Sequence, residues 1–277
     1  MNKYILSISV IVVAISLTAC GGGSGGGGVD DVGDGSASGT TCLNNNVSSV
    51  DTGNGCLQLL TSRSIEKPRI LWVFLHGDGS DGGASDYIFN KLKGLAGGDS
   101  VAVGMIRPGY FTSDGRVSTG PDSDRRFGNY TQAVTDTLAA GLSKLKAHYE
   151  PDELIVVGHS GGAALAALIS SFHPNVADRT VLAACPCNLP QWTNTNENTL
   201  FTSLSPHRYV NQLSTEVPVL VVVGENDTNT FPQISIDYTV LAQTAGVMAT
   251  YEVIAGSNHN GIIGSQLIAL ILQWTNN

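Results

Sequence analysis

Short apolar runs alternate with longer stretches of helical periodicity from about residue 45 to the end of the chain. The runs are Ile70–Leu75, Val101–Ile106, Leu154–Val157, Val181–Ala184, Val219–Val223 and Thr250–Ile254. β-Branched residues without polar alternation are typical of strands that a parallel sheet buries on both faces. The apolar fraction of 42% is sufficient for a core of that size.

The stretches between the runs are predicted to be helices. They are Tyr87–Ala96, Tyr130–Tyr149, Ala163–Phe172, Ile234–Ala245 and Gly264–Trp274. In the longest of them, Val134, Leu138, Leu142 and Leu145 lie on one stripe. Alternation of strands and helices predicts one α/β domain with a doubly wound, mostly parallel sheet. The segment 42–64 is expected to add one or two irregular strands at an edge.

Residues 1–19 are organised like an export signal. Lys3 precedes an apolar run, Tyr4–Leu17, that is shorter than the roughly 20 residues of a membrane-spanning helix. The sequence Leu-Thr-Ala-Cys at 17–20 resembles the lipobox of bacterial lipoproteins, in which the signal is cut before the cysteine. The resemblance implies acylation of Cys20 and anchoring to the bacterial cell envelope. An ordinary secretory signal with a chance cysteine is the alternative.

Residues 20–41 are predicted to be a flexible tether. Gly21–Gly28 reads GGGSGGGG and an acidic stretch follows it, so the segment has little apolar surface to bury. Gly21 stands where the resembled lipoproteins sometimes carry a retention aspartate, which favours the outer membrane in a double-membraned bacterium. The globular domain is then expected to span residues 42–277.

Charge and cysteine content narrow the function classes. A net charge of −9 with only 14 Lys and Arg argues against nucleic-acid binding, which needs a basic face. An exported chain meets an oxidising compartment, so a disulfide is expected between Cys42 and Cys56. The Cys-Pro-Cys sequence at 185–187 leaves the pairing of its thiols open. No histidine stands at ligand spacing beside these thiols, so no metal site is expected.

Residues 158–162 read Gly-His-Ser-Gly-Gly and fit G-x-S-x-G, a strand-to-helix turn that carries a nucleophilic serine. The tether contains the same pattern around Ser24, so the pattern alone is weak evidence. Its context is stronger, because an apolar run leads into it and a helical stretch follows at once. A serine at a helix N-terminus also has backbone N–H groups beside it for developing negative charge. Ser160 is therefore the candidate nucleophile, against the alternative of a plain turn serine.

A serine nucleophile needs a base that an acid orients. His259 follows the last predicted strand, in the turn 256–261, and is the candidate base. His207 precedes the strand that carries the acid and fits less well. The other histidines are expected to be solvated, structural or turned away from the serine: His76, His148, His159 and His173.

The candidate acid is Asp227, which follows the run Val219–Val223 at the strand edge where α/β sheets collect their sites. Glu225 is the alternative acid. An oxyanion hole needs two N–H donors. One is expected from Gly161, the residue after the nucleophile, and one from Asp78 in the glycine-containing loop after the first buried strand.

These motifs together resemble the α/β-hydrolase family over about residues 65–275. They are His76-Gly77, the serine turn, the acid turn at 224–227 and the histidine turn, in the family's order and each after a predicted strand. The sequence Ser-Pro-His-Arg-Tyr at 205–209 is similar to the prolyl-oligopeptidase-like and dienelactone-hydrolase-like branches. The resemblance implies an α/β-hydrolase fold and a serine hydrolase with Ser160, Asp227 and His259 as its triad. It implies no metal and no organic cofactor.

We expect the chain to hydrolyse a carboxylic ester through an acyl-enzyme. A serine peptidase of the prolyl-oligopeptidase-like type is one alternative, although the chain carries no segment for the propeller of such peptidases. A non-catalytic, lipid-anchored binding protein is the other. The expected partners are a small-molecule or peptide acyl substrate and a membrane, and the motifs leave the oligomeric state open.

Two segments are candidates for shaping a substrate pocket. The segment 107–127 carries four arginines that could hold a carboxylate or phosphate, or that could pair with nearby aspartates at the surface. The arginines are Arg107, Arg116, Arg125 and Arg126, and the aspartates are Asp114, Asp122 and Asp124. The segment 188–205, rich in Asn and Thr, is expected to form a short cap.

Overall fold

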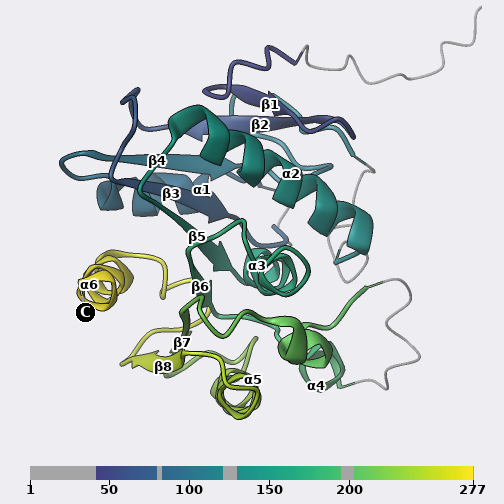
Figure 1. Cartoon of the computed structure of the whole chain (residues 1–277). Coiled ribbons are helices and arrows are strands. Elements are labelled where there is room, and N and C mark those ends of the chain that lie inside the picture. The colour runs from purple at the N-terminus through teal and green to yellow at the C-terminus, as the bar shows by residue number, and fades with distance from the viewer. Residues whose placement is uncertain (1–41, 80–82, 121–129, 195–202, 277) are drawn as a thin grey trace, which may run out of the picture. The chain divides into compact units, whose positions relative to one another are not determined.

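The computed structural model describes residues 42–79, 83–120, 130–194 and 203–276. All of them belong to one compact unit, Ser38–Asn277. Within them, a sheet of eight strands runs in the order β1-β2-β4-β3-β5-β6-β7-β8 (Figure 1). The strands are β1 Ser49–Asp51, β2 Cys56–Thr61, β3 Ile70–Leu75, β4 Ser100–Met105, β5 Glu153–His159, β6 Arg179–Ala183, β7 Val219–Gly224 and β8 Ala249–Ile254. The fold class predicted from the sequence is confirmed.

The pairing of the strands follows from their side chains. β3 to β8 are mutually parallel, and every residue of β3, β4 and β7 is buried, as expected for uninterrupted apolar runs. β1 and β2 form the antiparallel edge that the segment 42–64 predicts. β8 is the other edge, and its Thr250 and Glu252 are exposed.

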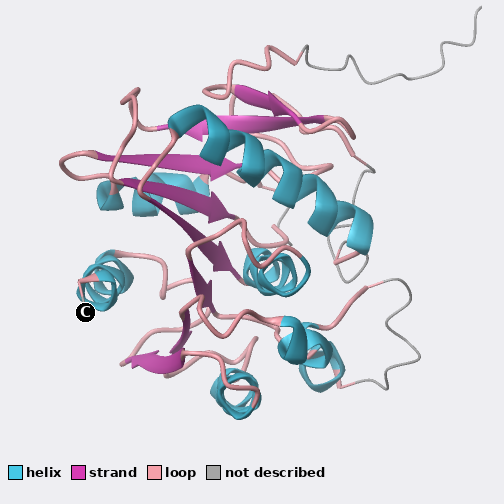
Figure 2. Ribbon diagram, in the orientation of Figure 1, coloured by secondary structure: helices cyan, strands magenta, loops and turns pink. Residues whose placement is uncertain are grey.

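Helices cover both faces of the sheet (Figure 2). One face packs against α2 Gln132–Tyr149, α3 Gly161–Phe172 and α5 Pro232–Thr244. The other packs against α1 Tyr87–Leu92, the 3-10 helix η1 Lys93–Leu95 and α6 Ser265–Thr275. Among the described residues, two short elements lie between β6 and β7, namely α4 Leu189–Thr193 and the 3-10 helix η3 Pro206–Gln212. The result is the three-layer arrangement that strand–helix alternation predicts.

Local sequence explains where the longest helix begins and what it buries. The Thr131 side chain accepts a hydrogen bond from the N–H of Val134, so α2 starts after Thr131, two residues later than the periodicity suggested. The predicted stripe is confirmed, because Val134, Leu138, Leu142 and Leu145 are all buried in the core. The helix therefore packs against the sheet and against α3 through one apolar face.

Disulfides link Cys42 to Cys56 and Cys185 to Cys187. The first matches the expected pairing, and the second settles the pairing that the sequence left open. The predicted signal, the tether and Cys20 lie outside the described residues. Within the described ranges, no helix is both long and apolar enough to cross a membrane.

Candidate active site

Ser160 occupies the sharp turn between β5 and α3. Its φ of 53° and ψ of −123° form the strained backbone of a nucleophile elbow. A Cβ at Gly158 would lie 2.4 Å from the carbonyl oxygen of Gly162. A Cβ at Gly162 would lie 2.2 Å from the carbonyl oxygen of Leu75 in β3. These two positions require glycine because backbone carbonyls occupy the space that a side chain would need.

The structure brings Ser160, His259 and Asp227 together from three separate strand ends. Nε2 of His259 lies 3.0 Å from Oγ of Ser160, and Nδ1 of His259 lies 2.9 Å from Oδ2 of Asp227. Ser160 follows β5, Asp227 follows β7 and His259 follows β8, so the parallel sheet presents all three at one edge. The hydrogen-bonded order Ser–His–Asp is the geometry of an activated serine nucleophile.

The Asp227 carboxylate is buried and fully engaged. Its Oδ1 accepts the backbone N–H groups of Asn229 and Thr230 at 2.8 and 2.9 Å. Its Oδ2 accepts the Thr230 hydroxyl at 2.8 Å. Burial works to raise the pKa of this carboxyl, but the hydrogen bond and charge of His259, with the bonds from Thr230 and Asn229, lower it below its usual value. Asp227 is therefore held as the ionised partner of His259.

Glu225, the alternative acid, lies at the surface. Its Oε2 accepts the N–H of Gly256 at 2.8 Å, at the start of the turn that carries His259. It contacts that turn through the backbone, whereas Asp227 contacts the imidazole itself. The geometry therefore favours Asp227 over Glu225.

The loop after β3 lies against the elbow. A Cβ at Gly77 would lie 3.1 Å from Cβ of Ser160, and a Cβ at Gly161 would lie 2.1 Å from Oδ1 of Asp78. Asp78 and Gly161, the two residues expected to supply oxyanion donors, are thus immediate neighbours beside the serine. Their roles as donors remain a prediction.

The side chain of Asp78 is held from two sides. Nη1 of Arg107 donates to Oδ1 at 2.9 Å, and the Tyr130 hydroxyl donates to Oδ2 at 2.5 Å. Arg107 is only 1% exposed, and its guanidinium lies 4.8 Å from the ring centroid of Tyr110. This pairing orients the loop that carries the Asp78 amide.

The arginines of the segment 107–127 lie in different environments. Arg107 is neither a surface residue nor an open anion site, because it is buried against Asp78. Arg116 pairs with Asp114 at 3.0 Å, as the surface alternative expected. Arg125, Arg126, Asp122 and Asp124 lie outside the described residues.

The remaining histidines separate into buried and outer positions. His76 is buried beneath the loop, where Nε2 accepts the N–H of Arg107 at 3.0 Å and Nδ1 contacts the Gly77 carbonyl at 2.7 Å. Burial, followed by the charge of Arg107, lowers the pKa of His76 well below its ordinary value, consistent with a structural role. His148 is exposed, whereas His173 is paired with Asp136 at 2.8 Å rather than simply solvated.

Hydrogen bonds hold the segment after β6 against the rest of the domain. Asn188 caps α4 through the N–H of Gln191, and the indole of Trp192 donates to Asn229 at 2.9 Å. Ser205 accepts the N–H of Leu189 at 2.9 Å and contacts Nδ1 of His207 at 2.7 Å. The sequence at 205–209 is thus structural here, and residues 195–202 of the expected cap lie outside the described part.

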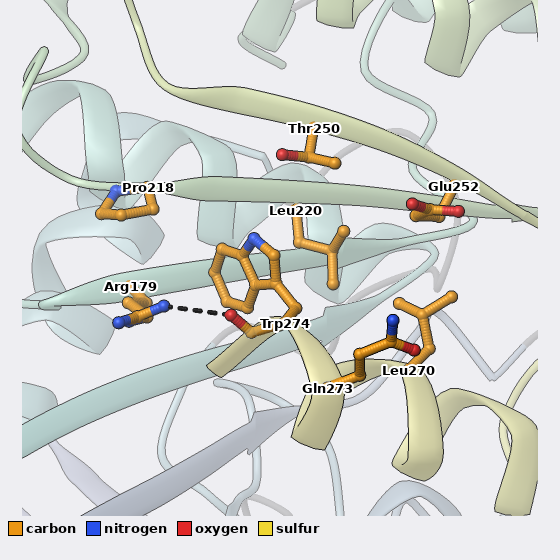
Figure 3. A pocket seen from close by; sticks show the side chains of 8 residues that line it. All are labelled: Arg179, Pro218, Leu220, Thr250, Glu252, Leu270, Gln273 and Trp274. Carbon is orange, nitrogen blue, oxygen red and sulfur yellow. Dashed lines mark hydrogen bonds between the residues drawn. The ribbon is translucent and has the colours of Figure 1, made fainter. Parts of the chain in front are cut away.

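A cavity of about 540 Å³ lies elsewhere in the domain (Figure 3). Its lining comes from the amino ends of β6, β7 and β8 and from α6: Arg179, Pro218, Leu220, Thr250, Glu252, Leu270, Gln273 and Trp274. Ser160, Asp227 and His259 follow the carboxyl ends of their strands, so this cavity is at the opposite end of the sheet. Arg179 is already engaged by Glu153 at 2.6 Å and by the Trp274 carbonyl at 3.3 Å.

The family model of the prolyl oligopeptidase family matches residues 126–277, more than half of the chain. The chain belongs to the prolyl oligopeptidase family. The matched region contains Ser160, Asp227 and His259, and this family member is a serine hydrolase of the α/β-hydrolase fold. No curated protein matches it by sequence.

Solved structures share the fold of this prolyl oligopeptidase family member. Est1E from Butyrivibrio proteoclasticus, solved with ferulic acid, is 14% identical with a TM-score of 0.62, covering 82% of this chain and 96% of its own. An esterase from Pyrobaculum calidifontis is 17% identical with a TM-score of 0.55, covering 79% of each chain. The acylaminoacyl peptidase of Pyrococcus horikoshii is 14% identical with a TM-score of 0.59, covering 80% of this chain and 39% of its own.

Sequence reasoning missed several residues of the site. Thr230 could have been found from the local sequence, since a threonine three residues after an aspartate can hydrogen-bond back to it. Tyr130 and Tyr87 carry none, because their hydroxyls meet partners 52 and 72 residues away in the chain. The ring of His159 contacts Tyr87 and the backbone oxygen of His259 rather than Ser160, consistent with the expectation that it points elsewhere, and its centroid lies 5.1 Å from that of the His259 ring.

Proposed function

We propose that the protein cleaves a carboxylic ester through an acyl-enzyme intermediate. Ser160 Oγ attacks the acyl carbonyl while His259 Nε2 takes its proton, and Asp227 stabilises the imidazolium that forms. The N–H groups of Asp78 and Gly161 hold the oxyanion. His259 then protonates the leaving alkoxide, and a water molecule, activated by the same imidazole, releases the acid.

The observation that carries this proposal is the continuous contact from Asp227 through His259 to Ser160 on a strained elbow. The 3.0 Å and 2.9 Å distances lie within hydrogen-bonding range, so proton transfer needs no rearrangement of the base. The elbow places Ser160 at the N-terminus of α3, where unpaired backbone N–H groups favour negative charge.

An ester is favoured over a peptide on chemical grounds. An alkoxide or phenoxide leaves with less help from a proton donor than an amine does, so the site as built is sufficient for it. The esterases Est1E and that of Pyrobaculum calidifontis correspond to this chain over most of their own length. The family name is the specific observation that favours the second candidate, a serine peptidase.

A paired substrate panel separates the two candidates. Wild type and Ser160→Ala would be assayed on p-nitrophenyl esters of increasing acyl length and on aminoacyl p-nitroanilides. We expect turnover of esters that Ser160→Ala lacks. Turnover of the anilides alone would replace the ester proposal with the peptidase, and equal rates for the two proteins on every substrate would remove Ser160 from the reaction.

We further propose that the protein is exported and lipidated at Cys20. The support is the sequence at 17–20 and the tether that follows it. Several acyl chains on one residue would anchor the domain stably, because each buried CH₂ contributes about 0.8 kcal/mol. Cys20→Ser should move the protein from the membrane fraction to the soluble fraction. Persistence of the variant in washed membranes would contradict the anchor.

A further inference from the structure

A partly buried chain of hydrogen bonds connects the loop after β3 with the turn that carries His259. The N–H of Gly77 donates to Oη of Tyr87 at 2.7 Å. Oη of Tyr87 lies 2.6 Å from Nδ1 of His159, and Nε2 of His159 lies 3.0 Å from the backbone oxygen of His259. The chain therefore joins four segments of the fold: the loop after β3, the first residue of α1, the last residue of β5 and the turn after β8.

The carbonyl oxygen of His259, at the end of this chain, determines which nitrogen of His159 donates and which accepts. The carbonyl oxygen of His259 can only accept, so Nε2 of His159 carries the proton. Nδ1 of the neutral ring is then an acceptor, and the Tyr87 hydroxyl donates to it. This leaves the lone pairs of Tyr87 Oη for the N–H of Gly77. Every group in the chain is satisfied in one arrangement of protons.

His159 is neutral in this environment. Its ring is buried, and burial, followed by the charge of the neighbouring His259, lowers the pKa of His159 to about 3. A second cation beside His259 would oppose the imidazolium that forms when Ser160 loses its proton. The chain therefore supports the His259 turn without adding a competing positive charge.

We propose that Tyr87 and His159 are positioning residues that hold the oxyanion loop and the His259 turn at a fixed separation around Ser160. Gly77 directly precedes Asp78, and the carbonyl that His159 binds belongs to His259 itself. Displacement of either end would change the distances among nucleophile, base and oxyanion donors. This inference rests on the proposed roles of Ser160, His259 and Asp78.

The first test removes one oxygen atom. Tyr87→Phe keeps the ring but loses the bonds to Gly77 and His159. We expect its rate of reaction with a fluorophosphonate probe to fall by about 10- to 100-fold, the effect of a misplaced reacting group. Tyr238→Phe is the matched control, because the Tyr238 hydroxyl is buried in α5 without a hydrogen-bond partner among the described residues. It should react at the wild-type rate.

The second test uses rescue. His159→Gln retains an amide N–H for the His259 carbonyl and an amide oxygen for Tyr87, whereas His159→Leu retains neither. The glutamine variant should recover most of the wild-type labelling rate, and the leucine variant should lose about as much as Tyr87→Phe. Equal losses in both variants would reduce His159 to a packing residue and overturn the proposal.

The third test needs no variant that could fail to fold. Nitrogen-15 NMR of the histidine rings in the wild-type protein should show His159 protonated at Nε2 and unprotonated at Nδ1 at neutral pH. Protonation at Nδ1 would overturn the proposal.

The Ser160→Ala variant distinguishes failure of the positioning proposal from failure of the proposed function. If Ser160→Ala still reacts with the probe, Ser160 is not the nucleophile and the proposed function fails. If Ser160→Ala is inert and Tyr87→Phe reacts at the wild-type rate, only the positioning role of Tyr87 is overturned.

Discussion

Arg107 and Asp78 form a largely buried ion pair directly beside the nucleophile elbow, with Nη1 of Arg107 2.9 Å from Oδ1 of Asp78. A carboxylate next to Gly161 would oppose the negative oxyanion that the site must stabilise. The guanidinium of Arg107, only 1% exposed, supplies the compensating charge. Its Nε and Nη2 atoms have no acceptor among the described residues, so Asp78 is its principal partner.

Removal of Arg107 should therefore be costly. Arg107→Met leaves the Asp78 charge without its partner in a largely buried position, and the free energy of unfolding should fall by about 3–5 kcal/mol. Urea unfolding followed by circular dichroism measures it. Lys67→Met is the control, because Lys67 and Glu150 are paired at 2.6 Å on the surface with side chains 74% and 60% exposed. Its cost should be far smaller, because an exposed ion pair contributes little to stability.

A double variant tests the reason for that cost. If the loss in Arg107→Met comes from an uncompensated charge, Asp78→Asn in the same chain should restore part of the stability. Simple addition of the two single losses would contradict the charge argument and point to packing instead.

Substitution of the acid should separate Asp227 from Glu225. Asp227→Asn removes the charge that orients His259, and kcat should fall by about 10⁴-fold on whichever ester proves to be turned over. Glu225→Gln keeps an oxygen for the N–H of Gly256 and should retain nearly wild-type kcat. The reverse ranking would transfer the role of the acid to Glu225.

The triad could be predicted from the sequence because a parallel sheet brings the carboxyl ends of its strands to one edge. Ser160, Asp227 and His259 each follow an apolar run, so their convergence required only the strands and their order. The α/β fold was accessible for the same reason, since β3, β4 and β7 are continuous buried runs.

The supporting residues could not be predicted in this way. Tyr87 meets Gly77 and His159 through the tip of a long side chain, and the position of that tip depends on how α1 packs against the sheet. Arg107 looked like a surface or ligand-binding cation because its spacing says nothing of the Asp78 side chain 29 residues earlier. Such pairs arise from tertiary packing rather than from local pattern.

Glycine at position 162 should be irreplaceable. In Gly162→Ala the new methyl group would meet the carbonyl oxygens of Leu75 and His76 at 2.2 and 2.4 Å, and neither backbone group can move aside. We expect a loss of more than about 3 kcal/mol in the free energy of unfolding, or no folded protein. Gly97→Ala is the control, because a Cβ there has nothing within 4 Å, and its cost should stay within about 0.5 kcal/mol. If Gly162→Ala and Gly97→Ala were equally stable in urea unfolding, the result would contradict the close approach of β3 to the elbow.

The buried His159 should make the protein less stable in acid. In the unfolded chain its imidazole takes up a proton below about pH 6.5, whereas in the folded protein its pKa of about 3 keeps the ring neutral. The unfolded state therefore binds more protons between these values, and the free energy of unfolding falls as the pH decreases from 6.5 toward 3. The contribution of this one ring approaches about 1.4 kcal/mol per pH unit. His159→Gln cannot titrate, so its stability measured by urea unfolding at pH 7, 6 and 5 should decline less steeply than that of the wild type. Parallel curves for the two proteins would contradict a neutral His159 in the folded state.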